Sequence, residues 1–239
     1  ANRSDGEADV VLVSTRDGEV IQNLTSGFDT EWESFGINNE FVGGRSIAFD
    51  PRGDHVGFFG RTGKGRSFFL VSAIDGKVQK KVPVPLDETQ APFLLADGRT
   101  VLFAALKEGV SDIWSLDLET GAVTNLTRDE YADNNPQVSP DGKLVVYERR
   151  ISGNAKVYAF PLGDPSRKTQ LTFGPFNDTA PTFSTDGKKV YYSSDEDDDI
   201  PNLRSLDLQT GAIAQYTDVF GGAMAPAPLK TPRGDRLAF

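Results

Sequence analysis

The sequence has no cysteine, which excludes disulfide bonds, thiolate catalysis and zinc sites built on cysteine ligands. Histidine is almost as scarce: His55 is the only one, and a lone histidine cannot form a histidine-rich metal site. We expect it to be a structural or surface residue. No segment approaches the roughly 18 consecutive apolar residues of a transmembrane helix. The sequence therefore predicts no membrane insertion by this chain, and any membrane association would come from a parent protein.

Positive charge is in deficit. Lysine and arginine number 25 against 35 aspartates and glutamates, which gives a formal net charge of −10. Nucleic-acid binding requires clustered lysine and arginine, so we expect no nucleic-acid partner. Apolar residues make up 38% of the chain and 16 residues are phenylalanine, enough for a substantial core. We expect one globular domain over residues 1–239, without a signal sequence in its polar first residues.

A turn that ends in glycine recurs along the whole chain. Its glycines are Gly53, Gly98, Gly142, Gly187 and Gly234, at intervals of 45, 44, 45 and 47 residues. The fullest version reads Ser139-Pro140-Asp141-Gly142. Proline presets one backbone angle, aspartate tolerates the next position, and glycine supplies the left-handed conformation. A β-rich apolar run follows each turn, which is typical of a strand covered on both faces.

Further strands and a second turn complete each repeat. In one repeat, a strand over Asp112–Leu118 leads into the turn Glu119-Thr120-Gly121 and then into a short strand that ends in Asn125-Leu126-Thr127. A unit of about 45 residues with four hairpin-connected strands is typical of a propeller blade. The sequence therefore predicts an all-β propeller of four-stranded antiparallel blades, with a stacked β-solenoid as the alternative.

The repeats divide the chain into five visible blades. Four are complete and cover residues 45–84, 91–127, 135–172 and 180–217. The fifth would combine residues 226–239 with residues 9–25, so that the two ends of the chain close the ring and leave no free sheet edge. Alternatively, the chain is part of a longer protein whose ring has six or more blades.

The repeat resembles a known family. One copy reads Ser139-Pro140-Asp141-Gly142-Lys143, followed by an apolar strand and later by a Leu-Thr pair. It resembles the Pro-Asp-Gly repeat of the TolB-like β-propeller family, and the resemblance runs from about Asp9 to Phe239. Similar repeats occur in the propellers of prolyl-oligopeptidase-like and tricorn-type peptidases. The resemblance implies a periplasmic or extracellular location in the cell envelope.

One blade has a closer likeness. The stretch from Ser193 to Gly211 is similar to the blades of large bacterial envelope proteins in which a peptidase-like domain adjoins the propeller. This chain departs from that pattern because it contains only propeller repeats and has no His-Glu-x-x-His motif. The resemblance is specific for fold, and it does not carry peptidase chemistry over to this chain.

One connection between blades is longer than its counterparts. Residues 26–44 form an insertion that carries four aromatic residues among acidic ones: Phe28, Trp32, Phe35 and Phe41. Insertions on one rim of a propeller often form the partner-specific surface, and aromatics rimmed by charge suit an interface. We predict that these residues bind a protein partner. The alternative is a loop that packs its own aromatics over the central channel.

Three acids lie just before the prolines that open successive blades: Asp87, Asp133 and Asp178. Propeller geometry gathers these connections on one face, so we predict that they bind a cation or a basic ligand at the mouth of the central channel. The alternative is that short polar side chains satisfy backbone groups where strands begin.

An acidic run is a candidate calcium site. Asp195, Asp197 and Asp199 alternate as in a calcium loop, which makes Ca²⁺ a candidate ligand. Ile200 and Leu206 stand where an EF-hand requires glycine and glutamate, so any calcium site would be a looser one. A solvated loop is the alternative, and we expect no other cofactor.

These observations favour a non-catalytic binding or scaffold module. It would mediate protein–protein interaction in the bacterial cell envelope, as part of a larger protein. The first alternative is a propeller that gates an adjoining peptidase. The second is a hydrolase or lyase whose acidic residues at the channel mouth act as acid and base.

Overall fold

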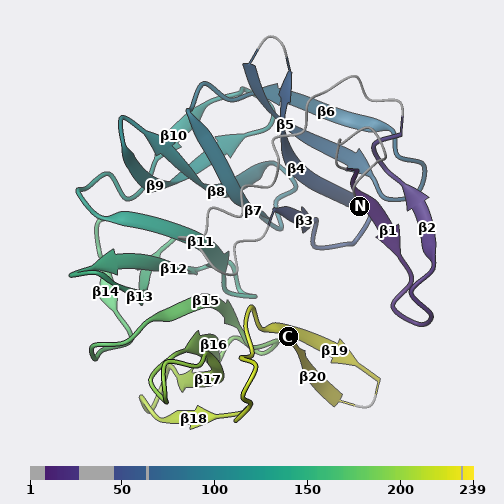
Figure 1. Ribbon diagram of the computed structural model, residues 1–239. Helices are drawn as coiled ribbons and strands as arrows, with labels where there is room; N and C mark the ends of the chain where they lie inside the picture. Colours follow the sequence, from purple (N-terminus) through teal and green to yellow (C-terminus); the bar gives the residue numbers. More distant parts are fainter. Residues whose placement is uncertain (1–8, 27–45, 63–64, 233) are drawn as a thin grey trace.

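The computed structural model describes residues 9–26, 46–62, 65–232 and 234–239, and this described part contains strands and turns but no helix. Figure 1 shows the sheets following one another around a common centre, in chain order from purple to yellow. Accordingly, the described residues include no helix of the length and apolarity needed to cross a membrane. The prediction of an all-β propeller is confirmed.

Four sheets contain four antiparallel strands each, and we number them as blades 1 to 4. Blade 1 comprises β3 (Ile47–Phe49), β4 (His55–Thr62), β5 (Gly65–Ser72) and β6 (Val78–Pro83). Blade 2 comprises β7 (Glu88–Leu94), β8 (Thr100–Lys107), β9 (Val110–Asp117) and β10 (Val123–Asn125). Blade 3 comprises β11 (Ala132–Val138), β12 (Leu144–Ile151), β13 (Asn154–Pro161) and β14 (Thr169–Gln170). Blade 4 comprises β15 (Asp178–Phe183), β16 (Lys189–Ser194), β17 (Asn202–Asp207) and β18 (Ile213–Gln215).

Two further strand pairs flank these blades. They are β1 (Val11–Val13) with β2 (Val20–Asn23), and β19 (Ala227–Thr231) with β20 (Gly234–Ala238). The first pair packs on blade 1, and β19 lies beside β15 of blade 4. Among the described residues the two pairs form separate two-stranded sheets. Closure of the ring by one blade that combines both pairs therefore stays a prediction.

Strand β8 shows why apolar residues occupy consecutive positions. Side chains along a strand alternate between its two faces. Val101 and Phe103 pack toward blade 1, where the rings of Phe103 and Phe59 lie 5.0 Å apart. Leu102 packs in the opposite direction, into a cluster that contains Tyr147 of blade 3. Each blade is thus covered by its neighbours, and the core consists of several inter-blade clusters.

The recurring turns have the predicted backbone conformation. Gly142 has a φ of 74°, and the equivalent Gly187 has a φ of 72°. The Ser139 hydroxyl donates to Asp141 Oδ1 at 2.6 Å and accepts the backbone N–H of Leu144 at 2.9 Å. The side chains of the turn therefore bind the first residue of the following strand, which fixes the start of the hairpin.

The repeated Leu-Thr pair has a structural role. Thr127 Oγ1 accepts a hydrogen bond from the backbone N–H of Ile113 at 3.0 Å and donates to Asp112 Oδ1 at 3.0 Å. Thr25, Thr172 and Thr217 accept the equivalent backbone hydrogen bonds from Val10, Val157 and Leu203. The threonine therefore joins the end of the outer strand to the third strand of its own blade.

Candidate binding site

The first strands of three blades, which lie nearest the centre in Figure 1, each contain a bulge at a proline. In β11 the pairing register shifts between Asn134 and Gln137, and β7 and β15 shift at the equivalent place. The residue before each of these prolines, and before Pro226 at the start of β19, has a positive φ: Ala91 51°, Asn135 50°, Ala180 51° and Ala225 54°. Left-handed backbone is uncommon outside glycine, and bulges re-aim side chains.

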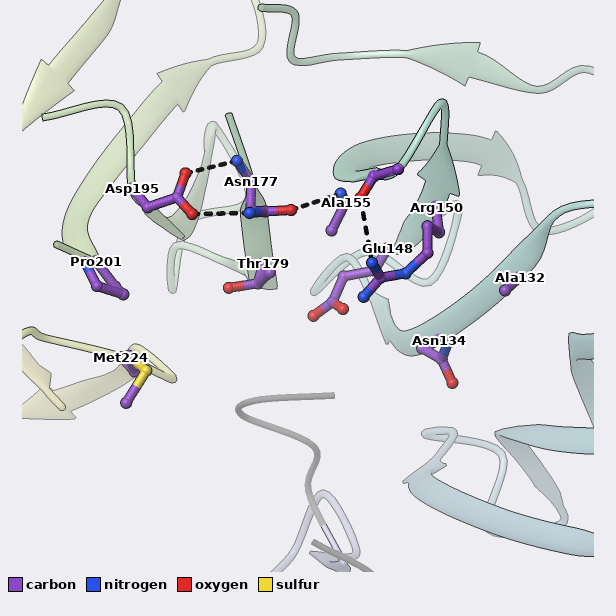
Figure 2. Close-up of a pocket in the computed structure, with 11 residues that line it drawn as sticks. Ala132, Asn134, Glu148, Arg150, Ala155, Asn177, Thr179, Asp195, Pro201 and Met224 are labelled. Carbon is purple, nitrogen blue, oxygen red and sulfur yellow. Dashed lines mark hydrogen bonds between the residues drawn. The ribbon is translucent and has the colours of Figure 1, made fainter. Parts of the chain in front are cut away.

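The residue that precedes each strained position differs in chemistry from repeat to repeat. These residues are Gln90, Asn134, Thr179 and Met224, at intervals of 44, 45 and 45 residues. The last three of them line one cavity of about 390 Å³ between blade 3, blade 4 and the segment before β19. Figure 2 shows their side chains around this space. A shared backbone geometry thus presents an amide, a hydroxyl and a thioether to one cavity.

A buried carboxylate forms part of the cavity wall. Glu148 of β12 is 4% exposed. Its Oε1 atom accepts a hydrogen bond from Asn135 Nδ2 at 2.6 Å and another from the backbone N–H of Ala180. Both donors are residues of the strained bulges, one in blade 3 and one in blade 4. Glu148 therefore joins the two bulges and places a carboxylate where the two blades meet.

A second carboxylate lies at the other side of the cavity. Asp195 accepts hydrogen bonds from the backbone and side-chain nitrogens of Asn177, at 2.6 and 2.8 Å. Asn177 Oδ1 in turn accepts the backbone N–H of Ala155 in blade 3 at 3.0 Å, as Figure 2 shows. The only cationic side chain that lines the cavity among the described residues is Arg150, which donates to the carbonyl oxygen of Gly153.

The neutral polar residues of the cavity wall differ in how many hydrogen bonds they already make with the protein. Asn134 Oδ1 accepts from Gln90 Nε2 at 2.6 Å and from the Ser111 hydroxyl at 3.2 Å, so its carbonyl oxygen is held by blade 2. Within the described part of the chain, the Thr179 hydroxyl has no hydrogen-bond partner, and the residue is half-buried. Thr179 thus offers a donor and an acceptor to an occupant of the cavity.

Asp133, predicted to face the channel mouth, is fully buried in an ion pair. Arg149 Nε donates to Asp133 Oδ1 at 2.8 Å, and Arg149 Nη2 donates to Oδ2 at 2.7 Å. The same Nη2 atom also donates to Asp129 at 2.6 Å, and Lys168 donates to Asp129 at 2.6 Å. Burial raises the pKa of Asp133 to about 6, although the guanidinium of Arg149 favours its ionised form.

The other two acids predicted at the channel mouth, Asp178 and Asp87, differ in burial and in their partners. Asp178 is 1% exposed and accepts a hydrogen bond from Lys156 Nζ at 2.9 Å, while that ammonium also lies 4.1 Å from the ring centroid of Phe176. Asp87 is exposed, and its backbone N–H donates to the carbonyl oxygen of Leu106. The structure gives Asp133 and Asp178 separate cationic partners, so the ligand site at the channel mouth stays a prediction without support from these contacts.

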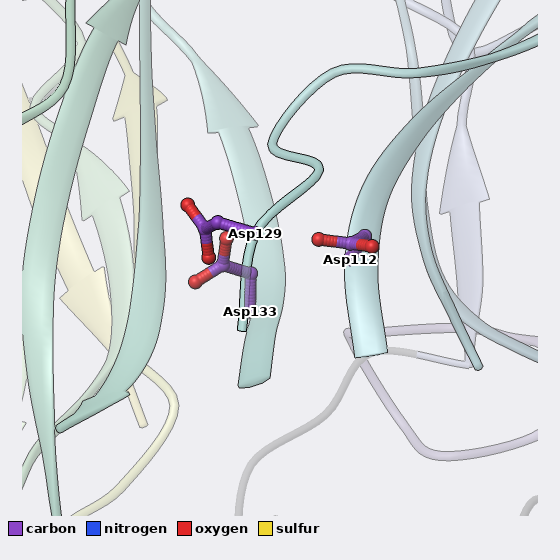
Figure 3. Close-up of side chains that lie close together, drawn as sticks. All are labelled: Asp112, Asp129 and Asp133. Atoms are coloured by element: carbon purple, nitrogen blue, oxygen red, sulfur yellow. The ribbon is translucent and has the colours of Figure 1, made fainter. Parts of the chain in front are cut away.

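A third acid lies beside the Asp129–Asp133 pair. Figure 3 shows Asp112 of β9 directed toward Asp129 and Asp133, and carboxylate oxygens of all three lie within 4.8 Å of one another. Carboxylate oxygens are ligands of hard metal ions. However, Arg149 and Lys168 already supply two positive charges to this cluster, and Thr127 binds Asp112. We therefore assign it as a contact between blades 2 and 3 in which two cations compensate most of the charge of three carboxylates.

The acidic run predicted to bind calcium is engaged with protein groups. Both oxygens of Asp195 bind Asn177, and Asp197 accepts from Arg204 Nη2 at 2.6 Å. Asp199 has a left-handed backbone with a φ of 58°. Among the described residues, the acids that converge closely enough for a metal are those of Figure 3, and this run is not one of them. Calcium binding therefore stays a prediction.

The predicted partner-binding aromatics lie outside the described residues. Phe28, Trp32, Phe35 and Phe41 all fall in residues 27–45, so their prediction stays as the sequence left it. His55, expected to be structural or on the surface, is one-third exposed with its Nδ1 atom 3.5 Å from Asp50 Oδ2.

Comparisons with known proteins address the fold. No family model matches the chain. The uncharacterized protein Atu1656 of Agrobacterium fabrum is 28% identical over 151 residues, and the match covers 60% of this chain and 51% of that protein. The crystal structure of TolB from Acinetobacter baumannii superposes with a TM-score of 0.64 at 24% identity, over 79% of this chain and 46% of that one. The chain has the TolB-like β-propeller fold.

Other solved structures share this TolB-like propeller. A protein of Agrobacterium tumefaciens described as TolB gives a TM-score of 0.61 at 19% identity and covers 77% of this chain and 65% of that one. A puromycin-hydrolyzing peptidase of Mycobacterium tuberculosis gives 0.57 at 14% identity, over 78% of this chain and 32% of the enzyme. The chain spans about half the length of the curated relative it matches. These likenesses establish the fold alone.

Sequence reasoning missed the residues that build the cavity. Glu148 stands inside an apolar strand pattern, and nothing in the chain order places it beside Ala180 of the next blade. The sequence nevertheless contained a clue to the bulges, because a proline recurs at the same place in three repeats, as Pro92, Pro136 and Pro181. The residue two before each proline varies in type, which is how repeat proteins present different side chains from a constant backbone.

Proposed function

We propose that this TolB-like propeller is a non-catalytic binding and scaffold module of the bacterial cell envelope, within a larger protein. It binds a protein partner through the face that carries the cavity between blades 3 and 4. The observation that carries this proposal is the cavity wall itself. Its bulges keep one backbone geometry while Asn134, Thr179 and Met224 differ in chemistry, as expected of a surface adapted to a ligand.

The ion pairs of the interior favour binding over catalysis. A general acid or base must reach its substrate within hydrogen-bond distance. Asp133 and Asp178 are at most 1% exposed and are paired with Arg149 and Lys156. Either carboxylate would have to leave a buried cation unpaired before it could act on a substrate, and that is costly. The envelope location is supported by the TolB-like repeat and fold.

A propeller that gates a peptidase is the second candidate. It is favoured by the likeness to the propeller part of a puromycin-hydrolyzing peptidase, of which this chain matches 32%. In that case the catalytic residues would belong to another part of the parent protein. The measurement is the ratio of the cleavage rates of long and short peptides by the peptidase domain. We expect this ratio to differ between the domain purified with this propeller and the domain purified without it.

Site-specific photo-cross-linking in cells of the source organism tests the proposal. A photoreactive amino acid replaces Thr179 in the cavity, and in a matched control it replaces Thr210, an exposed residue at the opposite end of the strands. We expect one defined protein adduct from position 179 and none from position 210. A third position, Trp32, tests the predicted contribution of the insertion. Absence of an adduct from position 179, or equal adducts from 179 and 210, would contradict the proposal.

A further inference from the structure

The cavity wall contains a deeply buried amide that the protein uses only in part. Asn134 is 1% exposed, and its Oδ1 atom is held by Gln90 and Ser111. Its Nδ2 atom has no hydrogen-bond partner among the described residues. That nitrogen is not one of the fully enclosed polar atoms, so its N–H groups reach the cavity that Asn134 lines. A donor on so buried a side chain is costly to leave unpaired, which indicates an acceptor from outside the chain.

A second unused polar group belongs to the next blade. Thr179 has the same place in β15 as Asn134 has in β11, two residues before the proline, and it lines the same cavity. These two strands contact each other. The Thr179 hydroxyl can donate one hydrogen bond and accept others. The two side chains therefore offer N–H and O–H donors and a hydroxyl acceptor to one ligand group.

The charged side chains of the wall are already engaged by the protein. Both oxygens of Asp195 accept hydrogen bonds from Asn177. Glu148 joins the two bulges, and Arg150 donates to a backbone carbonyl oxygen. A charged ligand group that leaves water needs a counter-ion or several hydrogen bonds, whereas a neutral polar group needs only hydrogen bonds. The unused groups of the cavity are both neutral, so they favour a neutral polar ligand.

A primary carboxamide matches the unused groups. Its carbonyl oxygen can accept from the Asn134 amide, and its NH₂ group can donate to the Thr179 hydroxyl. Ala132, Ala155 and Met224 supply apolar surface for the methylene groups that carry the carboxamide, and methionine adapts readily to the shape of an occupant. A volume of about 390 Å³ can take a glutamine side chain with part of its main chain.

We propose that the cavity binds a glutamine side chain of the partner protein through its carboxamide. This inference rests on the proposed function, because it names the part of the partner that enters the cavity. The hydrogen bonds of Asn134 Oδ1 to Gln90 and Ser111 orient the amide before the ligand arrives, which lowers the entropic cost of binding. A side chain without an amide would leave the Asn134 donors unpaired, and the site discriminates against it for that reason.

Titration with short peptides tests the inference without the partner. The probe is capped Gly-Gly-Gln-Gly-Gly, and three control peptides carry methionine, glutamate or glycine in place of the glutamine. Binding is followed in ¹H–¹⁵N spectra of the full chain, at the side-chain NH₂ signals of Asn134 and the backbone amide of Thr179. We expect saturable shifts with the glutamine peptide and binding at least about tenfold weaker for each control. Equal binding of any control peptide, or no shift with the glutamine peptide, would overturn the inference.

Three variants sharpen the test. Thr179→Val keeps the shape of the side chain and breaks no described hydrogen bond, and we expect it to weaken binding of the glutamine peptide about three- to tenfold. Thr124→Val is the matched control, because Thr124 is exposed on β10 and does not line the cavity. It should bind as the wild type does.

Asn134→Asp retains acceptor oxygens for Gln90 and Ser111 but removes both N–H donors, so it should weaken binding about tenfold or more. Wild-type affinity in Thr179→Val would overturn the inference even if Asn134→Asp folds poorly. An equal loss in Thr179→Val and Thr124→Val would also overturn it, because the effect would then not come from the cavity.

The outcome is separable from that of the proposed function. If position 179 still cross-links to a partner while the glutamine peptide does not bind, the module binds its partner and the inference about the carboxamide is wrong. If the glutamine peptide binds but no partner is cross-linked, the cavity chemistry stands and the proposed function fails. Equal binding of the glycine control would mean that the cavity binds peptide main chain, which would contradict the inference about the side chain.

Discussion

At the scale of single residues, the buried charges are arranged as partners across strands and blades. Asp133 and Asp178 were recognisable in the sequence as recurring acids, but their roles were not. Their partners Arg149 and Lys156 come from neighbouring strands in blade 3, and chain order does not reveal which charges meet. Glu148 escaped notice for the same reason, because Ala180 of blade 4 comes next to it only when blades 3 and 4 pack together.

Removal of one member of the buried Asp133–Arg149 ion pair should strongly destabilise the folded chain. Arg149→Leu leaves the Asp133 carboxylate buried without its cation, so we expect a loss of about 3–5 kcal/mol in the free energy of unfolding. Urea denaturation provides the measurement. Arg99→Leu is the matched control, since the Arg99–Asp117 pair lies on the surface and its loss should hardly move the unfolding midpoint. Similar effects of the two substitutions would show that burial does not govern the pair.

The titration of Asp133 provides a second test at this scale. Its pKa of about 6 in the folded chain lies above the ordinary value of 3.8, because burial opposes the charged form. The folded state therefore binds more protons than the unfolded state between these values, and this residue makes unfolding easier as the pH rises from about 4 to 6. Carbon NMR of the side-chain carboxyl should give a midpoint near 6 for Asp133. A midpoint below that of the exposed Asp141 would contradict the account.

At the scale of elements, the repeat predicted the hairpins well because turn chemistry is local. The Ser-Pro-Asp-Gly turn needs only its own residues and the first residue of the next strand, and all of them lie within six positions. The bulges were not predicted. A residue before proline ordinarily prefers extended backbone, whereas Ala91, Asn135 and Ala180 are left-handed. Tertiary contacts such as the Glu148–Ala180 hydrogen bond favour a conformation that local preference disfavours.

The turn glycines should differ in their tolerance to alanine. Gly142 has a φ of 74° and open space around its missing Cβ, so any effect of Gly142→Ala comes from backbone strain alone. We expect it to cost roughly 1–2 kcal/mol in the free energy of unfolding. Gly163 also has open space but no positive φ, so Gly163→Ala should be neutral or slightly stabilising. Equal effects in thermal unfolding would contradict this assignment of strain.

At the scale of the whole molecule, the packing of each blade on its neighbours sets the distribution of stability. Blades 2 and 3 have apolar clusters on both faces, whereas most residues of β19 and β20 are exposed or half-buried. Repetition allowed the blades and their order to be predicted from the sequence. The closure of the ring by residues 226–239 with residues 9–25 was also predicted, and it stays a prediction, because the two strand pairs form separate sheets among the described residues.

Hydrogen exchange should reveal this distribution. A two-stranded sheet with exposed faces is marginally stable by itself, so its amides open often. We expect the amides of β19 and β20 to exchange orders of magnitude faster than those of β8, β9, β12 and β13. Mass spectrometry of peptides after timed exchange gives the comparison. Equal protection of β20 and β8 would show that stability is uniform around the molecule.

The central claim is that the face with the cavity between blades 3 and 4 binds a protein partner. The most direct measurement is the dissociation constant of the cross-linked partner for the wild type, for Thr179→Arg and for the opposite-face control Thr210→Arg, by calorimetry. The account predicts binding about tenfold or more weaker for Thr179→Arg, equivalent to about 1.4 kcal/mol, and unchanged binding for Thr210→Arg. Equal affinities of the wild type and Thr179→Arg, or an equal loss in both variants, would contradict it.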